Sequence, residues 1–464
     1  MKYAQITQTD QIEESIKILS ATVPDCKVED YRNQYEITDK REIMDVTKRP
    51  NKTIKVDETT TRLEYVNRLA LPLQKRIVNS TVSFTFGNPV ELVCEADEET
   101  TEGQILTAVK RMLSDNKIDS FNRGIARDLA RCTEVAECWF PVPTEESHDH
   151  YGFTTSFKIR VQQFSPWNGD MLYPFFDKTG DMIAFSRAFA QKEDGKDVRY
   201  FEVYTDEEKV IWKNAGQGWE EESKEPNVLK KIPVVYAKQD RVEWHDVETM
   251  INRLEKVLSN FGDTNDYFGS PILGIWGKIM GLSAKGTQGK VMEFEGDAKA
   301  EYISWDQAPE SVKFEVENLF RLIYGLSQTP DLSFDSVKGL DISGIAMRFL
   351  FMDAHLKVQD KREILDAYLQ RRINILKAFV GVLNTTWRKQ SLKLEIAPKI
   401  VPFIITNEKD IIDLLSEATG GKPVISQKTA VGMTGLVDDV EEEYKQIQQE
   451  QEQANKLDVF NPVA

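Results

Sequence analysis

Residues 231–261 read KIPVVYAKQDRVEWHDVETMINRLEKVLSNF, and the hydrophobic period changes within this stretch. The start, KIPVVYA, is rich in β-branched and aromatic side chains, which is typical of a short strand. Further on, apolar residues recur at steps of four, three, four and three, which places them on one side of a helix. This apolar stripe consists of Val247, Ile251, Leu254, Leu258 and Phe261. We therefore predict an α+β protein in which a β region ends here and a long helix begins.

The region upstream alternates between helical and extended patterns. Residues 134–240 hold short segments rich in β-branched and aromatic residues, joined by hairpin-type turns such as DKTGD (177–181) and EDGKD (193–197). This predicts a mainly antiparallel β region. Before it, we expect a helix-biased stretch at 1–65, a helix leading to an extended stop at 65–89, a solvated acidic loop at 95–102, and two helices within 104–131.

A second helix with the same stepping follows further along the chain. Its stripe consists of Val312, Val316, Leu319, Ile323 and Leu326. Between the two helices, residues 271–304 are Gly-rich at first and then extended, which predicts a small β-containing unit. A narrow stripe is poorly covered in a single chain, and helices of this kind commonly pack against copies of themselves. The residues expected to mediate self-association are Val247, Ile251, Leu254, Leu258, Val316 and Ile323.

Residues 331–349, DLSFDSVKGLDISGIAMRF, follow the second helix and mix Asp, Ser and Gly with a single Lys. The segment is too irregular for a helix and too polar for a core, which predicts a loop over its first half. Ser343 is a natural N-cap for a very long helix from 344 to about 388. We expect residues 391–404 to be extended and the tail after them to be helical.

The length, net charge and cysteine count of the chain limit the class of protein to which it can belong. The chain has 464 residues and a formal net charge of −17, which argues against a sequence-independent DNA clamp because such a clamp needs a basic surface. Four cysteines in so long a chain argue against a secreted disulfide scaffold. The start lacks a signal-peptide pattern, and no apolar run approaches the roughly 20 residues that span a bilayer. We expect a soluble protein without a membrane partner, made in a reducing cytoplasm.

Signatures of enzyme or metal chemistry are weak. The spacing of Cys132, Cys138, His148 and His150 fits no common zinc module, so core and surface-turn roles are favoured for them. Residues 281–290, GLSAKGTQGK, lack the residue order of a phosphate-binding loop. No Ser–His–Asp or Cys–His set can be assembled. We predict no catalytic residue, no metal and no cofactor.

Several stretches of the sequence, in a fixed order and spacing, show a family resemblance. Over roughly residues 60–450 the chain resembles the portal (head-to-tail connector) proteins of tailed bacteriophages, in the group typified by the portal of the Bacillus siphophage SPP-one. The strings are NRLALPLQKRIVNSTVSFTFGNPVEL (67–92), the stretch 231–261 quoted above, DISGIAMRFLFMDAHLKVQDKREILDAYLQRRINILKAF (341–379) and GGKPVISQKTAVGMTGLVDDVEEEYKQIQQEQ (420–451).

The resemblance implies an elongated multi-part subunit that assembles into a ring. Its parts would be a wing, a helical stem, a β-containing clip and a helical crown. Carried onto this sequence, they are an N-terminal helical segment (1–65), the wing (66–241), stem helix 1 (242–270), the clip (271–306), stem helix 2 (307–329), the tunnel loop (330–343), a long wing helix with a strand (344–404), and the crown with the C-terminal tail (405–464).

The resemblance also implies a function and a set of partners. Portals of this group form a ring, usually of twelve subunits, at one capsid vertex of the virion, and they are assembled in the host bacterial cytoplasm. Double-stranded DNA enters through the ring during packaging and leaves through it at ejection. The implied partners are the terminase large subunit, the head-tail adaptor, the major capsid and scaffolding proteins, and other copies of the chain. The packaging ATPase is a separate protein, so the chain itself is expected not to be an enzyme.

Within the implied tunnel loop, Lys338 is the candidate for a passing phosphate contact, and the alternative, that it pairs with a carboxylate of a neighbouring subunit, stays open. Asp331, Asp335 and Asp341 would keep the rim from holding DNA too tightly. Phe334 is expected to pack against a neighbouring subunit, because the bases of a duplex are not available for stacking.

Within the implied clip, an apolar and basic patch is expected to contact the adaptor and the terminase. Its residues are Trp276, Lys278, Ile279 and Met280. For Trp276, packing between subunits is an equally good interpretation.

Two other functions are compatible with the sequence. One is a metal-dependent enzyme that processes nucleic acid with an unrecognised site among its 76 carboxylates. The other is a monomeric or dimeric binding module whose two striped helices form an ordinary coiled coil. The size of the particle and magnesium-dependent cleavage of nucleic acid distinguish these functions from a portal ring.

Overall fold

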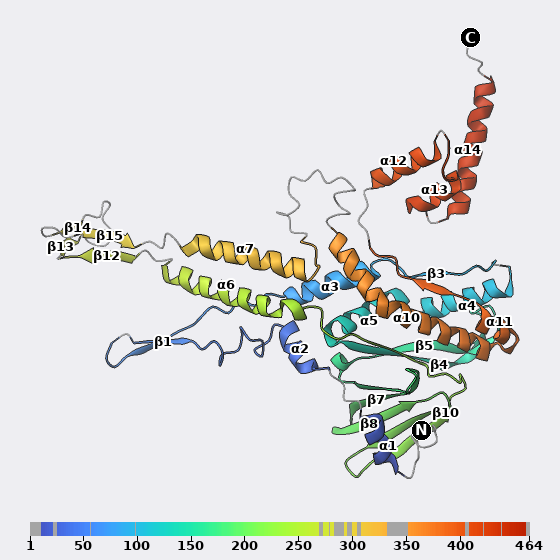
Figure 1. The fold of residues 1–464 in the computed structure, drawn as a ribbon, viewed down its shortest axis with the longest axis horizontal. Helices are drawn as coiled ribbons and strands as arrows, with labels where there is room; N and C mark the ends of the chain where they lie inside the picture. Colours follow the sequence, from blue (N-terminus) through green and yellow to red (C-terminus); the bar gives the residue numbers. More distant parts are fainter. Residues whose placement is uncertain are drawn as a thin grey trace. The chain divides into compact units, whose positions relative to one another are not determined.

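The fold is known from a computed structural model of the chain (Figure 1). The structure describes most of the sequence. The described residues are 11–21, 26–55, 57–97, 99–268, 272–277, 279–282, 292–294, 299–303, 308–331, 351–403, 408–420, 422–437 and 439–460.

The chain divides into two compact units. The first unit comprises residues 1–331 and 353–402, and the second comprises 332–352 and 403–464. The chain therefore leaves the first unit after Asp331 and returns to it at Asp353. This division isolates the segment 332–352, whose first part was predicted as a loop.

The main core of the first unit lies where four helices pack against a three-stranded sheet of order β11-β4-β5 (Figure 1). Arg372 on the longest of these helices is buried and donates two bonds to the Glu137 carboxylate on β4 at 2.7 and 2.6 Å, and one to Asn122 at 2.6 Å. A buried ion pair thus joins helix to sheet. The helices are α3 (Leu73–Phe86), α4 (Thr101–Asp115), α5 (Ile118–Cys132) and α10 (Met352–Leu383), and the strands are β4 (Glu134–His148), β5 (Thr155–Phe164) and β11 (Val234–Lys238).

A second sheet has five strands in the order β10-β9-β8-β7-β6, all antiparallel, as the pattern over 134–240 predicted. Asp194 and Gly195 both have positive φ, 48° and 80°, between β7 and β8. Two such residues form the tight turn that matches the twist of a hairpin. The strands are β6 (Met171–Phe176), β7 (Met182–Glu193), β8 (Lys196–Tyr204), β9 (Glu208–Asn214) and β10 (Glu220–Pro226).

The two striped helices are present as α6 (Glu248–Phe268) and α7 (Ala308–Leu326). They lie side by side, and two small hairpins lie between them in the sequence (Figure 1). One hairpin pairs β12 with β15 and the other pairs β13 with β14, so the predicted β-containing unit is confirmed in its described part. Their bounds are β12 (Ile272–Trp276), β13 (Ile279–Leu282), β14 (Met292–Phe294) and β15 (Lys299–Ile303).

The N-terminal part differs from the helical expectation. It contains the helices α1 (Ile12–Leu19) and α2 (Val28–Tyr35), but then a hairpin of β1 (Lys52–Lys55) and β2 (Thr61–Glu64). The helix expected over 65–89 begins only at Leu73, directly after Pro72, since proline suits the start of a helix and not its interior. The acidic loop ends earlier than expected, because the Thr100 side chain caps α4 by accepting from the amide of Gly103 at 3.2 Å.

The region after α10 also differs from expectation. α10 ends at Leu383, before the predicted end, and a short helix α11 (Arg388–Lys393) overlaps the start of the stretch 391–404 that was expected to be extended. Only β16 (Ala397–Lys399) is a strand there, paired with β3 (Glu91–Val93). The proposed N-cap Ser343 lies outside the described residues.

The described part of the second unit contains three helices, as predicted for the tail. They are α12 (Glu408–Thr419), α13 (Gln427–Thr434) and α14 (Val440–Phe460). Ser426 caps α13 by accepting from the amide of Thr429 at 3.1 Å. No helix in the part of the chain that the structure describes is long and apolar enough to cross a membrane.

Candidate functional site

The apolar stripes of α6 and α7 face the interior of the chain, except that Leu326 at the end of the second stripe is 55% exposed. Val247, Ile251, Leu254 and Ile323 are between 0% and 1% exposed, and Leu258 and Val316 pack against the same core. On the surface of the pair, Arg253 donates to the Glu315 carboxylate at 2.8 Å. Side chains that one chain already covers leave no apolar surface for a second copy. Val247, Ile251, Leu254 and Ile323 are therefore covered within the chain. Leu258 and Val316 are only partly buried, and self-association through the six residues stays a prediction.

One side of α6 is covered by residues 34–71, which we call the N-terminal strap. Arg41 of the strap is 2% exposed and forms an ion pair with Glu255, whose carboxylate also accepts from the amide of Leu71 at 2.8 Å. Nearer the end of α6, Arg49 pairs with Asp263 at 2.7 Å. The strap therefore binds the helix mainly through charged groups.

Residues of the strap contact residues of α6 at a constant separation in the sequence. Gln34, Arg41 and Arg49 contact Glu248, Glu255 and Asp263, and each pair is 214 residues apart in the sequence. The spacing is preserved because the strap coils in successive turns, for example where the amide of Asp45 donates to the carbonyl of Arg41 at 2.9 Å. Sequence reasoning missed this contact. The sequence signal for this contact is the matched spacing of opposite charges in the two segments. The local sequence does not indicate which two segments align.

The outer side of α7 carries exposed apolar side chains beside polar ones. Phe314 is 69% exposed, Leu322 43% and Leu326 55%. At 3.6 residues per turn Phe314 and Leu322 lie on one side of the helix with the polar Asn318 between them. Leu326 instead lines a pocket together with Val242 and Val247. Gly325 lies on the same face, and a side chain added there would meet nothing within 4 Å. The helix α7 thus has a covered apolar face and a mixed outer side.

The structure describes the expected clip patch only in part. Trp276, at the end of β12, is 57% exposed. Ile279 and Met280 belong to β13, but their side chains, like all of Lys278, lie outside the described residues.

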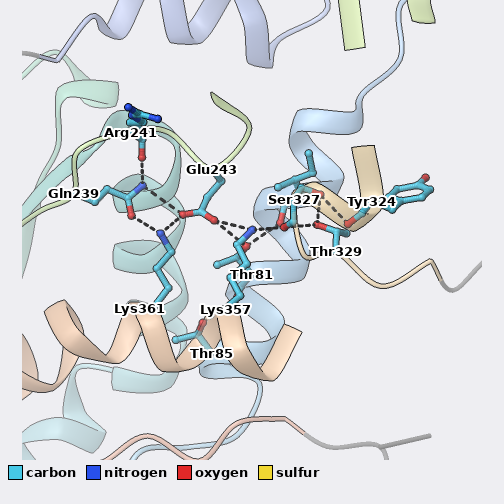
Figure 2. Close-up of polar contacts among 11 residues, drawn as sticks. Thr81, Thr85, Gln239, Arg241, Glu243, Tyr324, Ser327, Thr329, Lys357 and Lys361 are labelled. Atoms are coloured by element: carbon cyan, nitrogen blue, oxygen red, sulfur yellow. Dashed lines mark hydrogen bonds and ion pairs between the residues drawn. The ribbon is translucent and has the colours of Figure 1, made fainter. Parts of the chain in front are cut away.

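A polar network joins the two sides of the segment 332–352, because Lys357 lies after it and Ser327 before it (Figure 2). The Lys357 ammonium donates to the carbonyl of Ser327 at 2.9 Å and forms an ion pair with Glu243 at 2.8 Å. Lys361, one turn along α10, pairs with the other oxygen of Glu243 and donates to Gln239 at 2.9 Å. One carboxylate thus holds two lysines of α10 at the place where α7 ends.

The end of α7 is itself fixed by local hydrogen bonds. The amide of Thr329 donates to the carbonyl of Tyr324 at 3.0 Å, and the Ser327 hydroxyl donates to the Thr329 hydroxyl at 3.0 Å (Figure 2). Gln328 between them has a φ of 51°, a left-handed conformation that stops the helix. These contacts orient the Ser327 carbonyl so that it accepts the hydrogen bond from Lys357.

Glu243 is charged despite its burial. Its side chain is 2% exposed. Burial by itself raises the pKa of this carboxyl, but the two ammonium groups together outweigh it and lower the pKa to about 2. Thr81 on α3 also donates to Glu243 at 3.3 Å. The network therefore carries one negative and two positive charges and ties α3, α7 and α10 together.

Asp331 is the one residue of the predicted loop set that the structure describes. It forms an ion pair with Arg76 of α3 at 3.3 Å, and the Arg76 guanidinium lies over the Tyr324 ring at 4.6 Å. Asp331 thus contacts the body of the unit at the last residue before the segment 332–352. Phe334, Asp335, Lys338 and Asp341 lie outside the described residues.

The cysteines and histidines that were weighed as metal ligands have other contacts. Cys138 is buried in an apolar cluster, where burial raises the pKa of its thiol to about 12. The carbonyl of Cys132 accepts from the Cys26 thiol at 2.8 Å, and His150 pairs with Asp115 at 3.0 Å. Among the described residues, no group of three or more His, Cys, Asp and Glu side chains is arranged to hold a metal ion.

Comparison with known proteins gives a family match and several structural likenesses. The family model described as phage portal protein, SPP1 Gp6-like, matches residues 27–457. A search of curated protein sequences returns no match. The chain is similar to a chain of the neck of an empty gene transfer agent (GTA) particle computed with C6 symmetry, at 12% identity and a TM-score of 0.45, covering 79% of this chain and 91% of that one.

Two further structures of the same kind are similar. One is the virion of a native GTA particle, at 12% identity and a TM-score of 0.41, covering 79% of this chain and 91% of that one. The other is the neck of a native GTA particle computed with C12 symmetry, at 11% identity and a TM-score of 0.38, covering 78% and 89%.

Proposed function

Because the chain belongs to the SPP1 Gp6-like family of phage portal proteins, we propose that it is the subunit of a ring, of twelve copies, at one vertex of a phage capsid. The ring is the conduit through which double-stranded DNA is packaged and ejected. The observation that carries this proposal is the family match, which spans residues 27–457 and so includes both units of the chain.

The elements take the following roles in the proposed ring. The pair α6 and α7 is the stem, and the hairpins of β12–β15 and β13–β14 are the clip. The two larger sheets with α3, α4, α5 and α10 form the wing, and α12, α13 and α14 form the crown. The segment 330–343 is the tunnel loop. These roles are supported by the order of the elements along the chain, which is helix, small β unit, helix, segment, long helix.

The network around Glu243 has a specific role in this proposal. A loop that surrounds moving DNA needs a base that does not move with it. Lys357 and Ser327 flank the segment 332–352 and are joined by a hydrogen bond of 2.9 Å. Because Glu243 binds Lys357 and Lys361 and is itself held by Thr81, the base is anchored to α3 in the wing. The loop can then change conformation while its ends stay in place.

The proposed ring is a structural particle and not an enzyme. Its partners are the terminase large subunit and the head-tail adaptor at the clip, and the major capsid and scaffolding proteins around the wing. An acidic subunit, with a net charge of −17, suits a channel through which DNA slides, since a basic lining would hold the phosphates.

The proposal is tested by the mass and shape of the purified particle. Native mass spectrometry and negative-stain images viewed along the particle axis are expected to reveal a closed annulus of about twelve chains. Rings of this kind can require a trigger, so the same images are taken of the protein assembled with scaffolding and capsid proteins. A chain that stays monomeric or dimeric in both preparations contradicts the proposal. Magnesium-dependent cleavage of DNA by the purified chain favours the nuclease alternative.

A further inference from the structure

An open cavity of about 500 Å³ lies in the first unit, between the three-stranded and the five-stranded sheet. Its walls come from β4 and β5 on one side, from β8, β9 and β10 on the other, and from the end of α10. Cavities of roughly this size with largely apolar walls are where proteins bind small ligands or the anchoring side chains of partners. The apolar residues of the wall include Phe140, Phe157, Val228, Phe379, Val382 and Leu383.

The apolar wall of the cavity reaches the protein surface at two residues. Phe157 on β5 is 41% exposed, and Val228, in the turn between β10 and β11, is 69% exposed. The turn is fixed, because the Asn227 side chain donates to the carbonyls of Thr205 and Lys231 at 2.7 and 2.8 Å. Val228 is therefore held at the cavity in an exposed position, and the site exists before a partner binds.

The strand β10 leads to this cavity. It is the last strand of its sheet, and in the described part of the chain it pairs with β9 alone. Six of its seven residues are exposed, and Glu225 and Pro226 at its end line the cavity. An edge strand presents unpaired amides and carbonyls to which an extended segment can add. A segment that adds to β10 thus reaches the cavity with one of its ends.

The charge of this edge selects the kind of segment. β10 carries four Glu and one Lys, and that lysine, Lys224, is already paired with Glu208 of β9 at 3.0 Å. The strands β9 and β10 together hold five Glu and three Lys, a net charge of −2. Like charges on adjacent strands are destabilising, so the edge disfavours a second acidic strand, including β10 of another copy, and favours a basic one.

We propose that the cavity and the edge of β10 bind a basic, extended segment of another protein. Lys and Arg side chains of the segment face the glutamates of β10, and an apolar side chain at its end enters the cavity beside Phe157 and Val228. In strand addition of this kind, main-chain hydrogen bonds supply affinity and the pocket supplies specificity. The inference rests on the proposed function, in which the wing lies against capsid and scaffolding proteins, and it states the chemistry of the partner segment there.

Binding of a synthetic peptide to the purified, unassembled chain tests the site. The probe is a fluorescein-labelled peptide, Leu-Gly-Lys-Thr-Lys-Thr-Lys-Gly-Leu, which carries Leu at both ends so that Leu reaches the cavity in either strand direction. Fluorescence anisotropy is expected to show at least tenfold tighter binding of this peptide than of the same peptide with both Leu replaced by Ser, or with all Lys replaced by Glu. Equal binding of the three peptides, or no binding at about 1 mM, overturns the proposal.

Two substitutions in the chain test the two parts of the site separately. Val228→Asp and Glu225→Lys are each expected to weaken binding of the Leu peptide at least fivefold. Both side chains are exposed, so the thermal unfolding of the chain is expected to stay unchanged. Val424→Asp and Glu450→Lys are the matched controls, because these exposed residues lie in the second unit. Equal losses of binding in the controls indicate non-specific attraction of the peptide and overturn the site.

Hydrogen exchange measures whether the peptide adds as a strand. The amides of residues 220–226 are expected to exchange at least fivefold more slowly when the Leu peptide is bound. Those of β6, at the opposite edge of the same sheet, are expected not to change. Unchanged exchange over 220–226 contradicts the addition to β10.

The failure of this inference is distinguishable from the failure of the ring. The peptide measurements use the unassembled chain, whereas ring formation is read from images. Rings that form from a chain that does not bind the peptide overturn the site and leave the proposed function intact. A chain that binds the peptide and forms no ring contradicts the proposed function and supports the site.

Discussion

Glu243 is the residue on which the base of the proposed tunnel loop depends. It is buried, yet it stays ionised because two ammonium groups contact its two oxygens. A buried charge is tolerated only when it is paired and hydrogen-bonded, and removing one partner leaves the others uncompensated. The same residue binds α10 directly and α7 through Lys357, so its loss affects both ends of the segment 332–352 at once.

Glu243→Gln is expected to lower the free energy of unfolding by about 3 kcal/mol near pH 7. The folded pKa of about 2 lies below the ordinary value of 4.5, so the contribution of Glu243 is fully present above about pH 4.5 and is lost as the pH falls toward 2. The difference between wild type and variant should therefore narrow over that range. Urea unfolding of the unassembled chain at pH 7, 5 and 3.5 measures it.

The matched control is Glu315→Gln, which changes the same group in an ion pair that is about half exposed. Arg253 and Glu315 are 54% and 39% exposed. An exposed pair of this kind contributes about 0–1 kcal/mol. The network is not the anchor proposed for the loop if both substitutions lower the free energy of unfolding equally at pH 7. The same holds if the difference in that free energy between wild type and Glu243→Gln does not depend on pH.

At the scale of elements, the helix pair is stabilised from two sides that the chain itself supplies. The core packs against the inner stripe, and the strap covers one flank of α6 through charged contacts. Because the strap is mostly turns and one exposed hairpin, it has little core of its own and depends on Arg41 and Arg49 for its position.

Arg41→Met is expected to release the strap from α6. The substitution leaves the Glu255 carboxylate buried, at 1% exposed, without its cation, which costs about 3–5 kcal/mol. The expected outcome is faster trypsin cleavage at the exposed hairpin residues Lys52, Lys55 and Arg62, followed by mass spectrometry. Lys48→Met, at an exposed position of the same strap, is the control and should leave the cleavage rate unchanged.

Deletion of residues 332–340 tests the segment between α7 and α10. Because the contacts of Ser327, Glu243 and Lys357 lie outside the deletion, the variant is expected to fold and to form rings at the wild-type level. Packaging or retention of DNA in assembled capsids should fall at least tenfold. Normal packaging by such rings would contradict the tunnel-loop role, whereas loss of rings would show that the segment is needed for assembly.

At the scale of the whole molecule, the charge of the chain bears on how the ring handles DNA. Non-specific DNA binding depends on Lys and Arg displacing counterions from phosphates. A chain with 76 acidic and 59 basic residues has no general surplus of cations for this purpose. If the proposed conduit is built of such chains, it is expected to guide DNA by shape and to release it readily.

The purified ring is accordingly expected to bind linear duplex DNA with a dissociation constant above about 10⁻⁴ M at roughly 150 mM salt, which is weaker than typical non-specific binders. Fluorescence anisotropy with a short labelled duplex measures this binding, and lysozyme, a small basic protein, serves as the positive control. Tight binding with a steep salt dependence would contradict a sliding channel.

The sequence by itself determined the type and order of most elements, but not the β1–β2 hairpin or α11. The change of period at residues 231–261, the turns of the antiparallel sheet and the stripes of α6 and α7 all depend on local patterns, because side chains repeat at 3.6 residues in a helix and at two in a strand. The helices of the tail and the small β unit followed from the same patterns, and the family resemblance came from the order of the strings.

Only the tertiary structure decided which surface each element meets. A stripe shows that a helix has an apolar face but not what covers it, so Val247, Ile251 and Leu254 were assigned to contacts between copies although they pack inside the chain. The partners of Glu243, Arg41 and Arg49 are separated from them by more than a hundred residues. Such pairs form because the folded core brings distant segments together and excludes water from them, and no local pattern encodes that.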